Sequence, residues 1–145
     1  MKFVLTNVGN LFSAKSISDY FISQKRKVDI NTVYNYLSAL ESAYIIRRVN
    51  RYNLKGKEIL KTNEKFYLSD HAFRYAKLGT KNMNYGRMLE NIVAIELLRR
   101  GYEVYAGVLY KKEIDFVAIK RNEKIYIQVS DNINDEETFK REVDP

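Results

Sequence analysis

The chain has 145 residues, of which 46% are hydrophobic and 30% are charged, enough for one domain or for two small ones. It contains no cysteine, which excludes disulfides, thiolate metal sites and a cysteine nucleophile. No apolar run reaches the roughly 18 residues of a membrane helix. The apolar stretch at the N-terminus is also shorter than the hydrophobic region of a signal peptide. The sequence therefore predicts a cytoplasmic protein with no membrane partner.

The net charge of +7 is unevenly distributed along the chain. Residues 1–84 carry 15 Lys/Arg and 6 Asp/Glu, a balance of +9, whereas residues 85–145 carry 10 and 12, a balance of −2. A basic front half attracts polyanions. This asymmetry predicts two modules. The first is expected to bind nucleic acid, in the form of duplex DNA.

Two helices are predicted in the front half. Residues 13–24 have apolar side chains at helical spacing, and the segment contains serine that can cap a helix. A basic turn, Lys25–Lys27, separates them from a second helix that begins near Asn31 and is capped by Asp29 or Asn31. The second helix should bury an apolar stripe made of Val33, Leu37, Leu40 and Tyr44.

The pattern then changes to extended segments on both sides of Lys55-Gly56-Lys57, which predicts a hairpin with a basic tip. Two helices followed by such a hairpin resemble a winged helix-turn-helix, whose second helix enters the major groove. Bases would be contacted by Asn35, Tyr36 and Ser38. The phosphate backbone would be contacted by Arg47, Arg51, Lys55, Lys57 and Lys61. Protein contact through the same fold stays open.

His71 is the only histidine, and it follows Ser69 and Asp70 directly. Triad members must converge from separate segments, so these three neighbours instead predict the capped start of a short helix over 72–78, with Gly79 at its end. The polar residues 79–85 form the predicted linker between a first domain, 1–78, and a second, 86–145.

The second domain is predicted to begin with a long helix that buries Leu89, Ile92, Val93 and Leu97. A strand from Tyr102 and two further strands follow, the last two joined by a turn at 121–124. In the second strand strict alternation places Asp115 on the face opposite Phe116. In the third, which extends to Ser130, Tyr126, Gln128 and Ser130 share a face. Another helix is expected near Asp135.

This order of elements resembles the core of the PD-(D/E)XK, or restriction-endonuclease-like, superfamily. The resemblance implies Glu90, Asp115 and Gln128 as the Mg²⁺ ligands, with Ser130 at the position of the motif lysine. Carboxylate oxygens hold the metal against a phosphate, and a lysine stabilises the developing charge. Glutamine offers a neutral carbonyl oxygen and serine offers no positive charge, so the implied catalytic motif is degenerate.

The series NVGNLFSAKSISDYF, INTVYNYLSALESAYIIRRV, KFYLSDHAFRYAKLG, GRMLENIVAIELLRRGYEVYAG, EIDFVAIK and KIYIQVS resembles the C-terminal half of a family of bacterial and archaeal AAA-type ATPases. It implies a mixed α and β fold, with a winged helix before a C-terminally incomplete nuclease-like domain. ATP would bind only to an N-terminal ATPase domain absent from this sequence, which has no GxxxxGK[ST] loop.

The expected function is a nucleic-acid-binding regulatory module of such an ATPase, without a cofactor of its own and with a degenerate nuclease-like site. An active Mg²⁺-dependent nuclease remains an alternative if a lysine from elsewhere reaches the site, the candidates being Lys112, Lys124 and Lys140. A module that docks a protein partner on the sheet or the hairpin is the third possibility.

Overall fold

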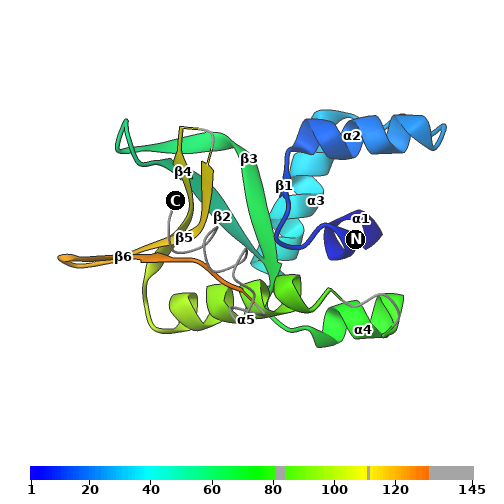
Figure 1. Cartoon of the computed structure of the whole chain (residues 1–145). Coiled ribbons are helices and arrows are strands. Elements are labelled where there is room, and N and C mark those ends of the chain that lie inside the picture. The colour runs from blue at the N-terminus through cyan, green and yellow to red at the C-terminus, as the bar shows by residue number, and fades with distance from the viewer. Residues whose placement is uncertain (81–83, 111, 131–145) are drawn as a thin grey trace.

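The computed structural model describes residues 1–80, 84–110 and 112–130, without the side chains of Lys61 and Thr62. In these residues a six-stranded mixed sheet has the order β1-β3-β2-β4-β5-β6, with α1, α2 and α3 beside β1 and with α4 and α5 below the sheet in the view of Figure 1. The strands are β1 (Leu11–Phe12), β2 (Ile46–Asn53), β3 (Glu58–Leu68), β4 (Glu103–Leu109), β5 (Lys112–Lys120) and β6 (Glu123–Ile127). The helices are α1 (Lys2–Thr6), α2 (Ala14–Ser23), α3 (Ile30–Ser42), α4 (Ala72–Leu78) and α5 (Tyr85–Arg99). The predicted mixture of α and β structure is confirmed.

The two predicted N-terminal helices are present, and their caps explain where they begin. Ser13 and Ser16 form a reciprocal capping box at the start of α2, and the Asp29 carboxylate accepts a 2.8 Å hydrogen bond from the Asn31 N–H at the start of α3. Tyr44 was wrongly placed in the buried stripe. It lies beyond α3 with φ 56° and is 66% exposed.

The predicted hairpin is formed by β2 and β3, which pair antiparallel with Lys55-Gly56-Lys57 between them. The register of the pair shifts after Val49, and β3 bends along its length (Figure 1). Strand β1 pairs antiparallel with β3 on its other side. Helix α1 and strand β1, of five and two residues, are too short to be predicted from periodicity.

A parallel pairing joins the two halves of the chain. Residues 50–53 of β2 lie beside residues 105–108 of β4, so the β2–β3 hairpin is an interior part of the sheet. The proposed boundary at 79–85, of which 81–83 lie outside the described residues, stays a prediction. Whatever the division, the strands before and after it form one sheet.

Helix α5 packs on β3, β4 and β5 and crosses one end of the sheet (Figure 1). Its buried side chains are Asn91, Ala94 and Leu97. The prediction for Leu97 is confirmed, but Ile92 is 48% exposed, so that part of the predicted face was wrong. The buried stripe passes through a polar residue, Asn91, which apolar periodicity does not detect.

The two last predicted strands are β5 and β6, joined by a turn at Arg121 and Asn122, because Lys120 already pairs with Glu123. Strand β6 ends at Ile127, so Gln128 and Ser130 follow the strand instead of lying within it. The helix expected near Asp135 lies outside the described residues. Within the described part of the chain, no helix has both the length and the apolar character needed to cross a bilayer.

Candidate functional site

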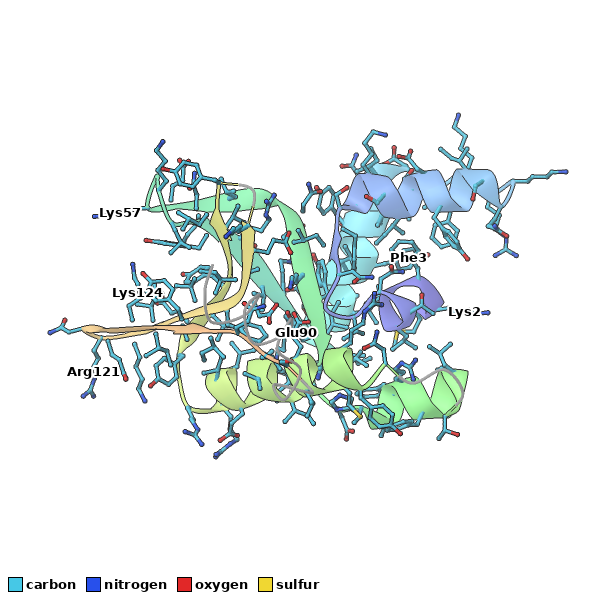
Figure 2. The ribbon with its side chains drawn as sticks, viewed as in Figure 1. Lys2, Phe3, Lys57, Glu90, Arg121 and Lys124 are labelled. Carbon is cyan, nitrogen blue, oxygen red and sulfur yellow. The ribbon has the colours of Figure 1, made fainter. Side chains whose placement is uncertain are left out.

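Glu90 of α5 accepts two hydrogen bonds from β3. Its Oε1 atom lies 2.9 Å from the Lys65 Nζ and 2.5 Å from the Tyr67 hydroxyl. The side chains of Lys65 and Glu90 are only 7% and 14% exposed, and Figure 2 labels Glu90 where α5 meets the sheet (Figure 2). Burial, followed by the charge and hydrogen bond of Glu90, raises the pKa of Tyr67 well above its usual range, so Tyr67 stays a neutral donor.

The local sequence explains this arrangement. Lys65 and Tyr67 are two residues apart on β3 and share one face of the strand, while Phe66 between them stacks on Phe12 with ring centroids 4.8 Å apart. A neighbour of Glu90 holds α5 in register with the end of β3: the Asn91 amide accepts from the Leu68 N–H at 2.7 Å and donates to its carbonyl at 2.9 Å.

The other carboxylate oxygen of Glu90 is also enclosed. Gly9 has φ 77°, and a Cβ atom built there would lie 3.3 Å from Glu90 Oε2. The Gly9 N–H donates to the Phe66 carbonyl, which fixes this turn against β3. A side chain at residue 9 would therefore strain the backbone and press on the carboxylate.

Asp115 lies at a β-bulge. The pairing of β4 and β5 shifts between Tyr105–Val117 and Gly107–Ile114, which leaves one extra residue on β5. Gly107 permits the close approach, because a Cβ atom there would meet Val117 Cγ2 at 2.9 Å and Ile114 Cβ at 3.0 Å. Bulges redirect side chains. The strict alternation from which the orientation of Asp115 was predicted is thus interrupted at this residue.

Asp115 and Gln128 do come together, across β5 and the end of β6. The Asp115 N–H donates to Gln128 Oε1 at 3.3 Å, and Asp115 Oδ2 accepts from the Val129 N–H at 2.9 Å. The Asp115 charge also helps to raise the pKa of Tyr67, the hydroxyl that donates to Glu90. The carboxylates of Glu90 and Asp115 therefore both raise the pKa of Tyr67, although different groups hydrogen-bond to each carboxylate.

The residues do not form a ready metal site. In residues 1–80, 84–110 and 112–130, no three Asp, Glu or His side chains lie close enough together to hold a metal ion. Glu90 is neutralised by Lys65, and the Gln128 carbonyl oxygen already accepts a backbone hydrogen bond. Mg²⁺ seeks several free hard oxygen ligands in octahedral geometry, which this arrangement does not offer. The roles predicted for Glu90, Asp115, Gln128 and Ser130 stay predictions.

A lysine outside the predicted set, Lys65, reaches the candidate acid Glu90. Of the three predicted candidates, Lys112 is exposed, Lys124 donates to the Tyr52 hydroxyl at 3.2 Å, and Lys140 lies outside the described residues. The available signal was a lysine within the otherwise apolar segment KFYL, two residues before a tyrosine. A charge inside a buried strand requires a partner.

The residues predicted to bind nucleic acid lie mostly on the surface. The side chains of Asn35, Tyr36 and Ser38 are exposed on α3, and Arg47, Lys55 and Lys57 are exposed on the hairpin; Figure 2 labels Lys57 near its far end (Figure 2). Arg51 differs, because its Nε atom is buried without a hydrogen-bond partner in the described structure. The Lys61 side chain lies outside the described part.

Residues 1–84 match the family described as a domain of unknown function, DUF8612. The chain belongs to this family. The DUF8612 chain is also 43% identical, over 128 residues, to an uncharacterized protein of Haemophilus influenzae, covering 88% of this chain and 32% of that protein. It is 32% identical, over 137 residues, to the uncharacterized protein MJ1544 of Methanocaldococcus jannaschii, covering 91% of this chain and 30% of that protein. No solved structure matches the DUF8612 chain.

The matches correct the family expected from the sequence. The chain was expected to be the C-terminal half of an AAA-type ATPase, but the family found is DUF8612, and neither relative is named as an ATPase. The expectation was wrong because a helix pair, a hairpin and a helix with three strands recur in many mixed folds. The DUF8612 chain spans about a third of the length of both relatives.

Proposed function

We propose that the DUF8612 chain binds duplex DNA through its N-terminal residues and that its C-terminal residues form a nuclease-like core without cutting activity. The order α1, β1, α2, α3, β2, β3, with β1 and β2 both antiparallel to β3, supports a winged-helix arrangement. In such an arrangement α3 would enter the major groove and the β2–β3 tip would lie along phosphates.

The observation that carries the proposal is the two-sided character of α3. Val33 and Leu37 are buried on one side of this 13-residue helix, while its other side is exposed and carries the polar groups Asn35, Tyr36 and Ser38. Amide and hydroxyl groups can donate to and accept from base edges. The helix lacks basic residues, so affinity for phosphates would come from the segments around it.

Two basic segments can supply that affinity. Residues 25–27, in the turn that precedes α3, are all basic and exposed, and Lys55 and Lys57 are exposed at the hairpin tip. The Lys55 Nζ lies 4.9 Å from the ring centroid of Tyr110, which is 73% exposed, so the hairpin tip is held beside the turn that follows β4. Each lysine that neutralises a phosphate releases a counterion and strengthens binding at low salt.

The C-terminal residues support a nuclease-like but inactive core. Helix α5 precedes the antiparallel strands β4, β5 and β6, with Asp115 on the middle strand, as the superfamily resemblance implies. Ser130 brings no positive charge, and Glu90 is bound by Lys65. The core would then serve as a scaffold for the DNA-binding part. A cytoplasmic location belongs to the same proposal.

The test is binding of fluorescent 20-base-pair duplexes of several sequences, measured by anisotropy from low to moderate salt. The Lys55→Glu, Lys57→Glu double variant should weaken binding to all duplexes alike and reduce the slope of log affinity against log salt by about 1 per lost phosphate contact. The charge-matched control is Lys77→Glu, Arg99→Glu on exposed helix positions. Equal losses in both variants would remove the hairpin from the interface, and a native chain that binds no duplex would favour the protein-docking alternative.

A further inference from the structure

A cavity of about 270 Å³ lies between α1, α4 and the first turns of α5. Helices α1 and α4 are in contact, and Figure 1 shows them on the same side of the molecule as the N-terminal end of α5 (Figure 1). Nothing in the proposed DNA interface uses this cavity. Its volume lies just below the roughly 300 Å³ at which pockets for drug-sized ligands begin, so the cavity can hold only a molecule smaller than those.

The charged side chains in the lining are basic. Arg74 of α4, Arg87 of α5 and His71 line the cavity, and among the described residues no aspartate or glutamate does. The His71 Nε2 atom is buried and has no hydrogen-bond partner in the described structure. A buried polar atom without a partner is costly. Two guanidinium groups and an unpaired imidazole nitrogen together favour a ligand that carries negative charge.

The helix geometry adds to this preference. Asn84, the N-cap of α5, also lines the cavity, so the positive end of the α5 dipole lies at its wall. α5 has 15 residues, long enough to give this end a partial positive charge. An anion placed here would be attracted by the helix end and by the arginines of the lining.

Most of the remaining lining is apolar, beside the neutral polar residues Thr6 and Asn91. Leu5 and Val8 come from α1 and the turn after it, and Leu68 and Met88 come from β3 and α5. Met88 is held in place by Tyr75, whose hydroxyl donates to the Met88 sulfur at 3.3 Å. A bare inorganic ion would leave this apolar wall without contacts, whereas an apolar group attached to the anion would cover it.

We propose that this cavity binds a small organic anion: an apolar body that carries one phosphate or carboxylate group. The arginines and His71 would hold the anionic group, and Leu5, Val8 and Met88 would contact the body. The two head groups share the same chemistry toward guanidinium. The site would be independent of nucleic acid.

The direct test uses the whole chain labelled with ¹³C at the methionine methyl groups. The Met88 methyl resonance, assigned from Met88→Leu, reports on the cavity wall, and Met1 serves as an internal reference. Phenyl phosphate and benzoate, titrated without nucleic acid, distinguish the two head groups; inorganic phosphate and benzyl alcohol each lack one half of the ligand. We expect saturable shifts of Met88 with phenyl phosphate or benzoate, at least tenfold tighter than with either control probe.

Variants locate the binding in the cavity. Arg74→Gln, Arg87→Gln should raise the Kd of the better probe at least tenfold, whereas Arg99→Gln, an exposed arginine on the same helix as Arg87, should leave it within twofold. His71→Gln, which keeps a polar group, gives a second variant if the double variant unfolds in a thermal scan, and should raise the Kd at least threefold. The proposal is overturned if no probe shifts Met88 or if either control probe binds equally well. It is also overturned if duplex DNA shifts Met88 where the small anions do not.

Discussion

Lys65 of β3 and Glu90 of α5 form an ion pair of 2.9 Å that is almost completely shielded from solvent. The pair joins β3, which is hydrogen-bonded to β1 and β2, to α5, which packs on β4 and β5. Lys65 thereby binds Glu90, the acid to which the nuclease resemblance assigns metal binding. A buried charge that loses its partner is strongly destabilising, even where the pair itself contributes little. The pair therefore works first as a constraint on how α5 sits against β3.

Replacing Lys65 by methionine keeps most of the side-chain volume but leaves the Glu90 carboxylate without a cation. We expect the free energy of unfolding to fall by about 3–5 kcal/mol at pH 7, the range for breaking one side of a buried pair. Urea denaturation followed by circular dichroism measures the loss. Lys65→Met combined with Glu90→Gln should recover part of it, because no unpaired charge remains. A double variant less stable than Lys65→Met would contradict the ion-pair explanation.

Tyr67 should make the protein sensitive to alkaline pH. Its pKa is raised in the folded chain, above the unfolded value of 10.0, so its stabilising contribution is complete below pH 10 and is lost as pH rises above that value. At pH 10.5 the loss is about 0.8 kcal/mol relative to pH 8, since the unfolded tyrosine ionises and the folded one does not. Urea denaturation of Tyr67→Phe at the two pH values should lack this increment. Tyr126→Phe, at a position 54% exposed, should retain it.

A matched pair of substitutions on α5 tests which face of the helix is buried. Leu97 is 7% exposed and Ile92 is 48% exposed. Leu97→Ala should cost about 2–5 kcal/mol, the range for removing a large side chain from a packed core, and Ile92→Ala should cost well under half of that. Chemical denaturation of both variants measures the difference. Similar losses would mean that α5 is rotated about its axis from the position described.

The chain should not cut DNA at a useful rate with Mg²⁺ or Mn²⁺. Glu90 is neutralised by Lys65, Gln128 is uncharged, and loss of a single preorganised electrostatic group typically costs about 10²–10³ in rate. The assay is nicking of supercoiled plasmid by the native chain beside Asp115→Ala. Nicking by the native chain that disappears in Asp115→Ala would show a working site and support the nuclease alternative.

The complementary experiment restores the motif with Gln128→Glu and Ser130→Lys. Gln128 Oε1 already faces the Asp115 N–H, so a glutamate there would bring a second carboxylate next to Asp115. Activity gained in the plasmid assay, and abolished by adding Asp115→Ala, would indicate that the strands keep a geometry able to hold metal. A restored motif that stays inactive is the expected result if Lys65 continues to neutralise Glu90.

Local signals in the sequence predicted the local structure well. The caps at Ser13 and Asp29 and the turn at Lys55-Gly56-Lys57 depend on side chains that bond to their own backbone or on residues suited to tight turns. Hydrophobic periodicity likewise located β5 and most of β6. These features need only neighbours along the chain, so a single sequence contains the information.

The interactions that define the candidate site depend on distant residues. Lys65 and Glu90 are 25 positions apart, and their contact requires β3 and α5 to meet at one depth. The bulge at Asp115 depends on the close approach of Gly107 on the neighbouring strand. The pattern of strand β5 alone predicts regular alternation. Pairing between strands and buried charge partners therefore lay beyond what periodicity could reveal.

The parallel pairing of β2 with β4 has a practical consequence for work on separate halves of this protein. A fragment that stopped before α5 would leave β2 with a row of free N–H and C=O groups along residues 50–53, where β4 now pairs. Open strands of this kind are templates for pairing with other chains and for aggregation. The hairpin that we propose to contact DNA would then have an unpaired strand edge able to bind other chains. Self-association of such a fragment could be mistaken for a natural oligomer.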